Sequence, residues 1–589
     1  MSAARAVLFG TKDGYAAIGL YALALHSASR HFFEGLGLCV IAGLVLELWF
    51  SRSRDRLGAG VVAGACVTAL VAYLFIAGLV PSLPMHAPDA RTMRGQLAHT
   101  AAGLCAITIA VLFAVGDRLG TAVVRSVVGG AAGLTTIAAG ALLMSISSSD
   151  RTGPSGEARP NVILISLDTV RADHLGCYGH SRATTPEIDR FFSKGSIRFE
   201  AAFAPQPWTL TSHMTMLTSL QPDVHGVNAE HGLPPRVLTL AQILTDAGYL
   251  AAGYVFDLIW MEERFGFDRG FHIYRRFYDD ARSRNRLVKV LLDDLKVERF
   301  FLFLHYYDAH SDRGELPYQS DPMDRTELTG TLRRDFKVSE SGGRRGTDLL
   351  WWMNQAGATL SEEDRRYLVD LYDAGLRSLD RALGELFRQL EDRGLLDNTI
   401  VVLTSDHGEE FLEHGKVLHT QFYDECMRVP LLFRAPGRGS ACSLPTLVGL
   451  VDLAPTILEL CGITPIPDMQ GRSLRALIDG EQDTADRRHV LLVDEKGHQG
   501  LRTATWKLLT TGAGRELYNL CEDPGERLNL LTAGMVPPHA EFLLRTLEQE
   551  QVHASELRSR VGDSGNGSIS ITESEAESLR ALGYLDEDF

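Results

Sequence analysis

Apolar residues are distributed unevenly along the 589-residue chain, and their pattern divides it into two regions. The first 150 residues contain four long apolar runs, at positions 32–50, 57–83, 97–116 and 122–146. Each run is close to the ~20 residues that a helix needs to cross a bilayer. A weaker run at 14–29 spans the membrane, lies at its interface or starts a hairpin, and is not expected to be a cleavable signal because further apolar runs follow it. The pattern predicts an all-α membrane bundle of four or five helices.

Beyond a polar linker at 151–160, the apolar runs become short and alternate with amphipathic stretches. The clearest helix is expected to begin near Ser361 and to end at Gly394, with acidic residues in its first turn. Strands that alternate with helices predict an α/β domain over 161–480, with a central, mostly parallel sheet and functional residues at the carboxyl ends of its strands. The strand-like runs are at 161–167, 249–255, 300–306, 399–405 and 429–433.

The two regions also differ in charge. The first 150 residues carry ten Lys and Arg against seven Asp and Glu, whereas the whole chain has a net charge of −16. The acidic remainder argues against nucleic acid as a partner. Arginine-rich loops at 51–56 and 117–125 are expected to be cytoplasmic, which would place the following domain on the outer face of a bacterial inner or plasma membrane. Arg91 and Arg94, in a predicted outer loop, are a contrary signal.

Polar side chains follow two of the predicted strands directly. The run at 161–167 leads into Asp168, and the run at 399–405 leads into Asp406 and His407. A single carboxylate at a strand end is ordinary and often caps a helix. Two such ends, one of them with adjacent Asp and His, indicate a site for a divalent cation. Carboxylates combined with imidazole suit Mn²⁺ or Zn²⁺ better than Ca²⁺.

Five segments, in order and spacing, resemble the sulfatase family of the sulfatase and alkaline-phosphatase superfamily. They are RPNVILISLDTVRADHLGCYG, PWTLTSHMTMLTSLQPDVHGV, HYYDAHSD, NTIVVLTSDHGEEFLEHGKVLHTQFYDECMRVPLLF, and the pair LRTATWKLL and ELYNLCEDPGERLNLL. The resemblance covers residues 160 to about 535. It implies a sulfatase-like sandwich in which a small sheet over 481–535 follows the large one, with C-terminal helices or a tail over 536–589.

The resemblance also assigns residues to a metal site. The metal positions of the family match Asp168, Asp406 and His407. The cysteine that sulfatases convert to formylglycine is Thr209 here, as in superfamily members that transfer phosphoryl groups through a metal-bound threonine. Thr209 as the N-cap of a helix is the structural alternative. One divalent ion (Mn, Zn, Ca or Mg, with Mn or Zn favoured) is therefore expected on these four residues.

Three histidines fall on active-site positions of the family. His213 replaces an arginine beside the nucleophile, His419 replaces a lysine, and His310 matches a family histidine. Each is a candidate catalytic residue, because imidazole donates hydrogen bonds to ester oxygens or protonates a leaving group. Thr169 replaces a second aspartate of the family, which makes Ca²⁺ less favourable.

For the other candidates, a purely structural or solvent-exposed role is at least as well supported as a functional one. Arg171 is a possible substrate contact and equally a structural ion pair, and Lys416 is a weaker substrate-binding candidate in a solvated loop. A second metal on Asp308, His310 and His419 is conceivable, but their close spacing favours one metal. The insert at 311–360, which contains Trp351 and Trp352, is either a lid or a disordered loop. The last residues, 570–589, predict an amphipathic helix.

Together these patterns predict a membrane-anchored, metal-dependent hydrolase or transferase. Thr209 would act on phosphate or phosphodiester groups of an envelope lipid or glycan. The first alternative is a sulfuric ester hydrolase that works without formylglycine. The second is a catalytically inactive binding protein.

Overall fold

A computed structural model describes residues 159–294, 299–312, 316–329, 346–481, 489–494, 497–512, 514–534 and 537–562. The chain divides between Glu157 and Ala158, so the described residues all belong to the second unit. The five predicted membrane segments lie outside the described residues. Within the described part, no helix combines the length and the apolar character needed to cross a bilayer.

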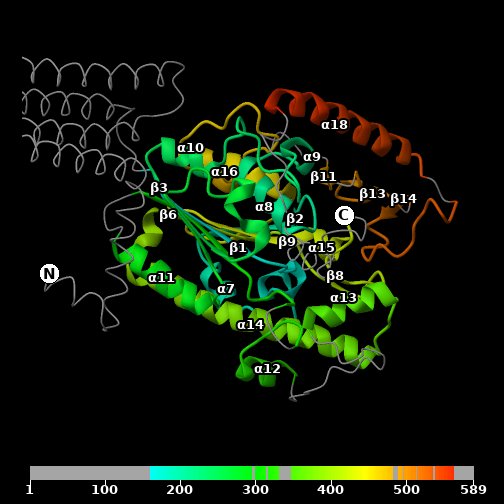
Figure 1. The fold of residues 1–589 in the computed structure, drawn as a ribbon, viewed down its shortest axis with the longest axis horizontal. Coiled ribbons are helices and arrows are strands. Elements are labelled where there is room, and N and C mark those ends of the chain that lie inside the picture. The colour runs from blue at the N-terminus through cyan, green and yellow to red at the C-terminus, as the bar shows by residue number, and fades with distance from the viewer. Residues whose placement is uncertain are drawn as a thin grey trace, which may run out of the picture. The chain divides into compact units, whose positions relative to one another are not determined.

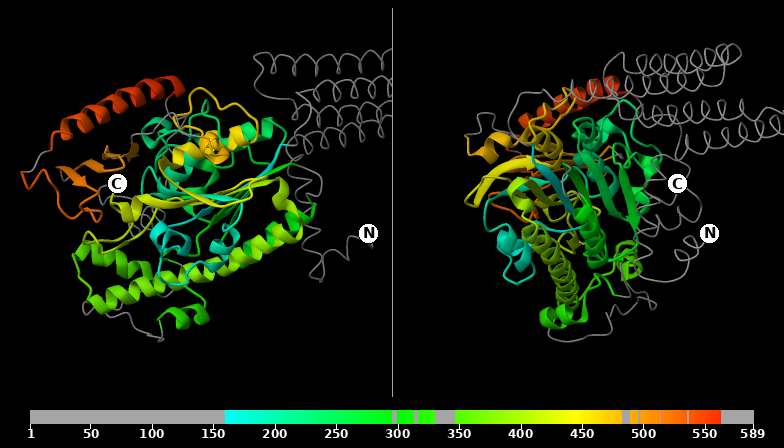
Figure 2. Two further views of the ribbon diagram at one scale, coloured as in Figure 1. Left: turned by 180° about the vertical axis from the view of Figure 1, so that it is seen from behind. Right: turned by 90° about the vertical axis from the view of Figure 1, so that its left-hand side faces the viewer.

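The second unit is built on an eight-stranded sheet (Figures 1 and 2) with the strand order β10-β2-β9-β6-β1-β5-β3-β4. Its strands are β1 (Asn161–Leu167), β2 (Ser196–Phe203), β3 (Leu250–Phe256), β4 (Ile273–Phe277), β5 (Phe300–Tyr306), β6 (Thr399–Ser405), β9 (Arg428–Arg434) and β10 (Cys442–Gly449). β1 pairs in parallel with β5 and β6, whereas β9 runs antiparallel to β6 and β2. The predicted α/β fold with a mostly parallel sheet is confirmed. The pattern missed β2, β4 and β10; β10 is partly exposed and contains Pro445, as edge strands often do.

Helices cover both faces of this sheet (Figure 1). On one face, α7 (Pro186–Phe191), α11 (Ala281–Asp294) and α14 (Glu362–Asp392) pack against Ile163 and Ile165 of β1. On the other face, α8 (Thr209–Thr218), α10 (Leu240–Asp246) and α16 (Leu453–Leu460) share a core with Val162 and Leu164. Successive strand residues point to opposite faces, so a strand buried on both sides reads as one apolar run.

The predicted long helix is α14. Ser361 is its N-cap, and the Ser361 hydroxyl accepts a hydrogen bond from the backbone N–H of Asp364. Acidic residues fill the first turn, which is favourable at the positive end of a helix dipole. Capping and dipole therefore explain why the helix starts where the sequence indicated.

The described part of the insert is folded onto the rest of the unit. It forms α12 (Pro322–Thr329) and α13 (Gly346–Ala356). Together with the first half of α14 and the hairpin of β7 (Glu410–Phe411) and β8 (Val417–Leu418), it builds a small core of its own. Trp351 and Trp352 are partly buried against that core. The disordered-loop alternative is therefore wrong for these described segments.

The small C-terminal sheet is also confirmed. It is antiparallel, in the order β11 (Val490–Val493), β12 (Gln499–Arg502), β13 (Trp506–Thr511) and β14 (Gly514–Asn519). Helix α18 (Ala540–Val561) packs Leu543 and Leu547 against Leu508 and Leu517 of this sheet. The predicted helix within 570–589 lies outside the described residues.

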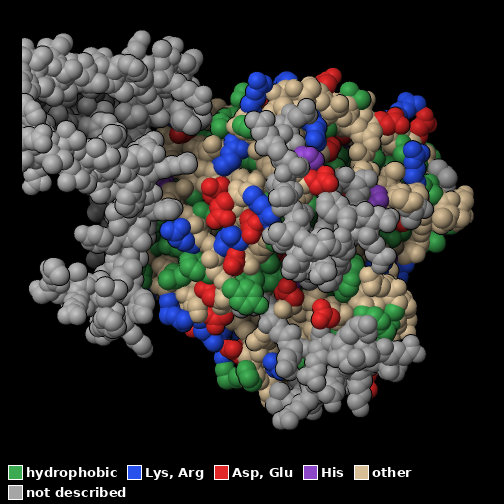
Figure 3. Space-filling model, viewed as in Figure 1, with side chains coloured by type: hydrophobic (Ala, Val, Ile, Leu, Met, Phe, Trp, Pro, Cys, Tyr) green, Lys and Arg blue, Asp and Glu red, His purple; other side chains and the backbone are tan. Residues whose placement is uncertain are grey.

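Charged side chains are mixed on the face of the molecule that Figure 3 shows. Lys and Arg are interspersed with Asp and Glu over the described surface there. Nucleic-acid binding usually depends on a basic patch or stripe, which is a different pattern. That the chain has no nucleic-acid partner stays a prediction.

Candidate active site

Three metal-ligand candidates meet where two neighbouring strands end. β1 and β6 pair in parallel, with Leu167 opposite Ser405, so the next residues, Asp168 and Asp406, emerge at the same edge. Asp168, Asp406 and His407 are fully buried. One ligand atom from each lies within 4.8 Å of the others. The sheet therefore brings together residues that are far apart in the sequence.

The unsatisfied atoms of this group indicate what it binds. Among the described residues, Asp168 Oδ1, Asp406 Oδ2 and His407 Nε2 have no hydrogen-bond partner. The last two atoms lie 3.4 Å apart. Burial and the neighbouring Asp406 raise the pKa of Asp168, because two buried carboxylates repel each other. Buried carboxylates of this kind need a compensating charge, so the donor set fits a divalent cation.

A strained residue links the two aspartates. Thr169 has a φ of 58°, a conformation that non-glycine residues rarely adopt. Its backbone N–H donates to Asp406 Oδ1 over 3.2 Å, and its hydroxyl donates to the backbone oxygen of Asp168. Thr169 thus occupies one oxygen of Asp406 and leaves Oδ2 facing the candidate metal position. Strain of this type is common where side chains are held for function.

Thr209 joins the group from helix α8, which packs on the face of the sheet that carries Val162 and Leu164. It is the first residue of α8, and its hydroxyl lies 3.4 Å from Asp168 Oδ2. The Ser212 hydroxyl, one turn further, donates to the backbone oxygen of Asp406 over 2.7 Å and fixes the start of the helix. Trp208, not Thr209, is the N-cap, so the N-cap reading of Thr209 is wrong. All four predicted ligands therefore lie together.

His305 is a site residue that the sequence reading missed. It lies near the end of β5, and its Nε2 donates to Asp168 Oδ2 over 3.0 Å. Burial lowers the pKa of His305 to about 3, so the ring is neutral. Its signal was the single imidazole near the end of the otherwise apolar run FFLFLHY. By holding Oδ2, His305 leaves Asp168 Oδ1 for the cation.

His213 is placed differently from the other two predicted histidines. Its Nδ1 donates to the backbone oxygen of Thr209, and its Nε2 accepts from the Ser166 hydroxyl, each over 2.8 Å. Burial lowers its pKa to about 4. Both ring nitrogens are therefore engaged inside the protein, and His213 helps to hold the backbone of Thr209 in place. This geometry favours a supporting role for His213 over direct contact with the transferred group.

His310 combines a fixed orientation with an unused donor. Its Nδ1 donates to Asp312 Oδ1 over 3.0 Å, and its ring stacks on Tyr307 at 4.2 Å. Its Nε2 is buried without a hydrogen-bond partner among the described residues. Burial lowers the pKa of His310, but Asp312 and the nearby Asp168 outweigh it and raise the value to about 9. The raised pKa favours a protonated ring beside the candidate metal ligands.

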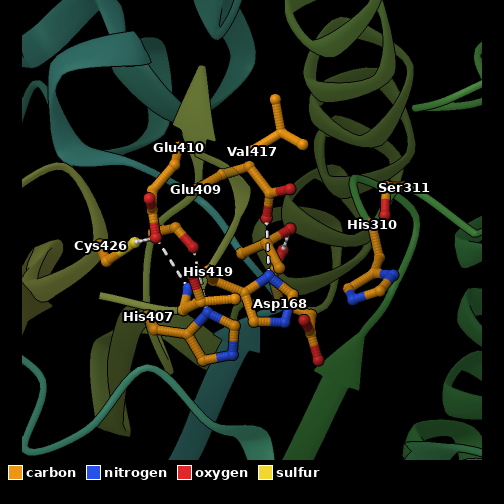
Figure 4. A network of polar contacts seen from close by, with 12 residues as sticks. Asp168, His310, Ser311, His407, Glu409, Glu410, Val417, His419 and Cys426 are labelled. Carbon is orange, nitrogen blue, oxygen red and sulfur yellow. Dashed lines mark hydrogen bonds and ion pairs between the residues drawn. The ribbon is translucent and has the colours of Figure 1, made fainter. Parts of the chain in front are cut away.

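His419 lies between the other histidines. Its Nδ1 donates to Glu409 Oε2 over 2.9 Å, and its ring lies 4.4 Å from that of His407 and 5.4 Å from that of His310. Figure 4 shows His407 and His419 on one side of Asp168 and His310 on the other. Two of the three predicted catalytic histidines therefore flank the metal-ligand group.

Asp308 does not complete a second metal site in the described part. Its Oδ1 accepts a hydrogen bond from the backbone N–H of Ala281, at the start of α11. The groups of metal-ligating side chains found there do not combine Asp308 with His310 and His419. The preference for one metal at this centre stays a prediction.

The two predicted substrate-binding cations are Arg171 and Lys416. The Arg171 guanidinium bonds Asp173, Glu413 and the backbone oxygen of Glu409. This is the structural ion pair that the sequence left open. Lys416 is exposed in the turn between β7 and β8. Substrate binding by either residue stays a prediction.

A second group, His174, His180 and Asp373, also has the composition of a metal site. Here each carboxylate oxygen is already engaged. Asp373 Oδ1 accepts from His174 over 2.6 Å, and Oδ2 accepts from His180 over 3.1 Å and from Arg182 over 2.9 Å. A guanidinium supplies the positive charge that a cation would bring. This group is a hydrogen-bonded structural cluster.

Comparison with known proteins agrees with the fold. The family model described as Sulfatase matches residues 160–463, and one described as N-sulphoglucosamine sulphohydrolase, C-terminal, matches 412–553. N-acetylglucosamine-6-O-sulfatase of Bacteroides thetaiotaomicron is 24% identical over 67% of this chain and 86% of its own. A structure solved with its substrate D-glucosamine-2-N,6-O-disulfate aligns with a TM-score of 0.53 at 22% identity, over 68% of this chain and 99% of that one. The structure of phosphonate monoester hydrolase of Agrobacterium radiobacter aligns with a TM-score of 0.54 at 18% identity, over 70% of this chain and 100% of that one.

Proposed function

The chain belongs to the sulfatase family and is a sulfatase-like ester hydrolase, and we propose that it cleaves phosphate esters with Thr209 as its nucleophile. The observation that carries this proposal is the position of the Thr209 hydroxyl, 3.4 Å from Asp168 Oδ2 at the start of α8. A threonine cannot be converted to formylglycine. It can attack phosphorus once its hydroxyl is activated.

The proposed cation would be held by Asp168, Asp406, His407 and the Thr209 oxygen. We favour Mn²⁺ or Zn²⁺, because two carboxylates and one imidazole suit these ions. When bound, such an ion stabilises developing negative charge on oxygen and neutralises the ester.

The protein's own groups account for the remaining steps. Asp168 Oδ2 accepts from the Thr209 hydroxyl and from His305, which aligns the nucleophile. The bond from Thr209 Oγ1 to phosphorus forms as the bond to the ester oxygen breaks, and water then releases phosphate and restores the hydroxyl. Asp312 orients the His310 ring, and its Nε2, which has no hydrogen-bond partner among the described residues, would donate a proton or hydrogen bond to the leaving oxygen.

A sulfate ester is the second candidate substrate, because the relatives that match most of this chain are named as sulfatases. The chemistry differs in the second step. A formylglycine hydrate expels sulfate by collapsing to the aldehyde, whereas a threonyl sulfate must be attacked by water. We therefore place phosphate first.

The proposed natural substrate is an ester on an envelope glycan or lipid. A neighbour of the same fold was solved with a glucosamine disulfate and another with a carrageenan hexaose. Attachment through the predicted helices of residues 1–150 would hold the domain at the outer face of the membrane.

The test is turnover of matched aryl phosphate, phosphodiester and sulfate esters by the manganese- or zinc-loaded full chain and by Thr209→Ala. Thr215→Ala, on the same helix, is the matched control. Phosphate turnover that is lost only in Thr209→Ala supports the proposal. Turnover of sulfate esters alone would refute the phosphate assignment, and activity retained by Thr209→Ala would refute the nucleophile.

A further inference from the structure

His419 stands where the resemblance to sulfatases places a lysine. An imidazole is shorter than a lysine side chain and has only two nitrogens, so its ring must be held at the correct distance and angle to act on a substrate. We propose that the insert between β5 and α14 does this, with Tyr318 and Asn354 as positioning residues for His419. The inference rests on the proposed function, because it assumes that His419 acts on the transferred group.

The first connection passes through Glu409. The Tyr318 hydroxyl donates to Glu409 Oε1 over 2.5 Å, and His419 Nδ1 donates to Glu409 Oε2 over 2.9 Å. Tyr318 and Glu409 are fully buried. Both oxygens of the carboxyl group are therefore engaged, one by the insert and one by the histidine. This fixes the ring plane of His419 and directs Nε2 away from Glu409, as second-layer carboxylates do for metal-bound histidines.

The second connection fixes the backbone before His419. The Asn354 side chain donates to the backbone oxygen of Val417 over 2.8 Å and accepts from its N–H over 2.9 Å. The next residue, Leu418, has a φ of 72°, which is strained for a leucine. A strained residue persists only where its surroundings hold it. The two bonds from Asn354 supply such a restraint one residue away.

The third connection is the small core that the insert shares with the hairpin. Tyr318, Leu350 and Met353 pack with Val417 and Leu418, separately from the cores on either face of the main sheet. Helix α13 also contacts the residue after His310, since the Thr347 hydroxyl lies 2.9 Å from that of Ser311. Figure 4 shows Ser311, His310 and Val417 around the same site.

In this scheme, two parts of the chain position different groups of the site. The sheet places the metal ligands, and the insert places His419. Tyr318 and Asn354 touch no reacting atom in this scheme. Removing either should loosen the histidine without removing it.

The test compares Tyr318→Phe and Asn354→Ala with Gln355→Ala, an exposed neighbour of Asn354 on α13. The manganese-loaded full chain in detergent is measured for kcat and KM on the best ester of the set above. Its affinity for vanadate, a mimic of the transferred group in transit, is measured by calorimetry. Each positioning variant is expected to lower kcat and vanadate affinity about tenfold, as other second-layer changes do, with KM within about twofold. Gln355→Ala should match the parent.

A double-mutant cycle with His419→Ala separates positioning from a general structural effect. If Tyr318 and Asn354 act through His419, neither substitution lowers vanadate affinity further in the His419→Ala background. Full additivity, or parental vanadate affinity in both single variants, overturns the inference. Tyr318→Phe keeps the ring in its core, so it still decides the question if Asn354→Ala does not fold. A chain that binds vanadate but cleaves no ester would refute the proposed function and leave the positioning result readable.

Discussion

The two sides of the candidate site are held in place by different means. Asp168, Asp406 and His407 follow directly from two paired parallel strands, so hydrogen bonds between the strands fix them. His310 and His419 lie on loops, and each is oriented by a carboxyl group, from Asp312 and Glu409 respectively. The sheet thus determines where the candidate metal ligands lie. The histidines depend instead on these two side-chain pairs.

The largest expected effect is on the sheet side. Asp406→Ala removes a buried ligand and should abolish stoichiometric metal binding, with kcat/KM reduced by about 10³-fold or more, or about 4 kcal/mol. Metal content by plasma mass spectrometry and turnover check this. Asp373→Asn, in the hydrogen-bonded cluster of His174 and His180, is the control and should keep the metal. Metal loss in Asp373→Asn but not in Asp406→Ala would mean that the wrong cluster has been chosen.

The next effect concerns the nucleophile. Thr209→Ser keeps a hydroxyl near Asp168 and should retain activity within about tenfold, whereas Thr209→Ala should lose about 10³-fold in kcat. Both variants should still bind vanadate and metal, which shows that the site is intact. Similar rates for the serine and alanine variants would remove Thr209 from the mechanism.

A smaller effect distinguishes the histidines from one another. His310→Asn should lower kcat about 10²-fold with little change in melting temperature, because it removes a donor that faces the site. His213→Asn should instead lower the melting temperature, because it disrupts two buried hydrogen bonds, each worth about 1 kcal/mol or more. Steady-state kinetics and thermal unfolding check both. The reverse pattern would exchange the roles assigned to these two residues.

The smallest effect is on stability and depends on pH. Burial raises the pKa of Glu410 to about 7, so the folded state binds a proton that the unfolded chain has released above its ordinary pKa. The contribution of this proton to the free energy of unfolding is complete at acidic pH and is lost as the pH rises towards 7. Glu410→Gln should therefore gain stability relative to the parent between pH 5 and pH 8, by roughly 2 kcal/mol. Denaturant unfolding at the two pH values measures this, and a constant difference would contradict it.

Short-range patterns predicted the sheet side well. The runs before Asp168 and Asp406 are apolar throughout, because strands buried on both faces leave few positions for polar residues, and the polar ends stand out. The same reading missed His305, which is hidden inside an apolar strand, and it overvalued His213, whose partners Ser166 and the backbone of Thr209 are fixed only by the fold. Edge strand β10 was missed because its exposed, Pro-containing half has no clear alternation.

The orientation of His419 could not be predicted from the sequence for a different reason. Tyr318 and Asn354 lie 101 and 65 residues before it, in an insert without a strand pattern. No local periodicity connects them to a hairpin of two-residue strands. The hydrogen bonds of Tyr318 and Asn354 and the packed core of the insert reveal that connection. Contacts of this kind depend on tertiary structure.

Mass spectrometry of the Thr209 peptide measures the central claim most directly. The metal-loaded chain is mixed briefly with an activated aryl phosphate, quenched in acid and digested. A phosphoryl group on Thr209, absent from Thr209→Ala and from a chelator-treated sample, is the predicted result. An unmodified Thr209 in a sample that is turning over substrate, with the adduct on another residue or water as the direct nucleophile, would contradict it.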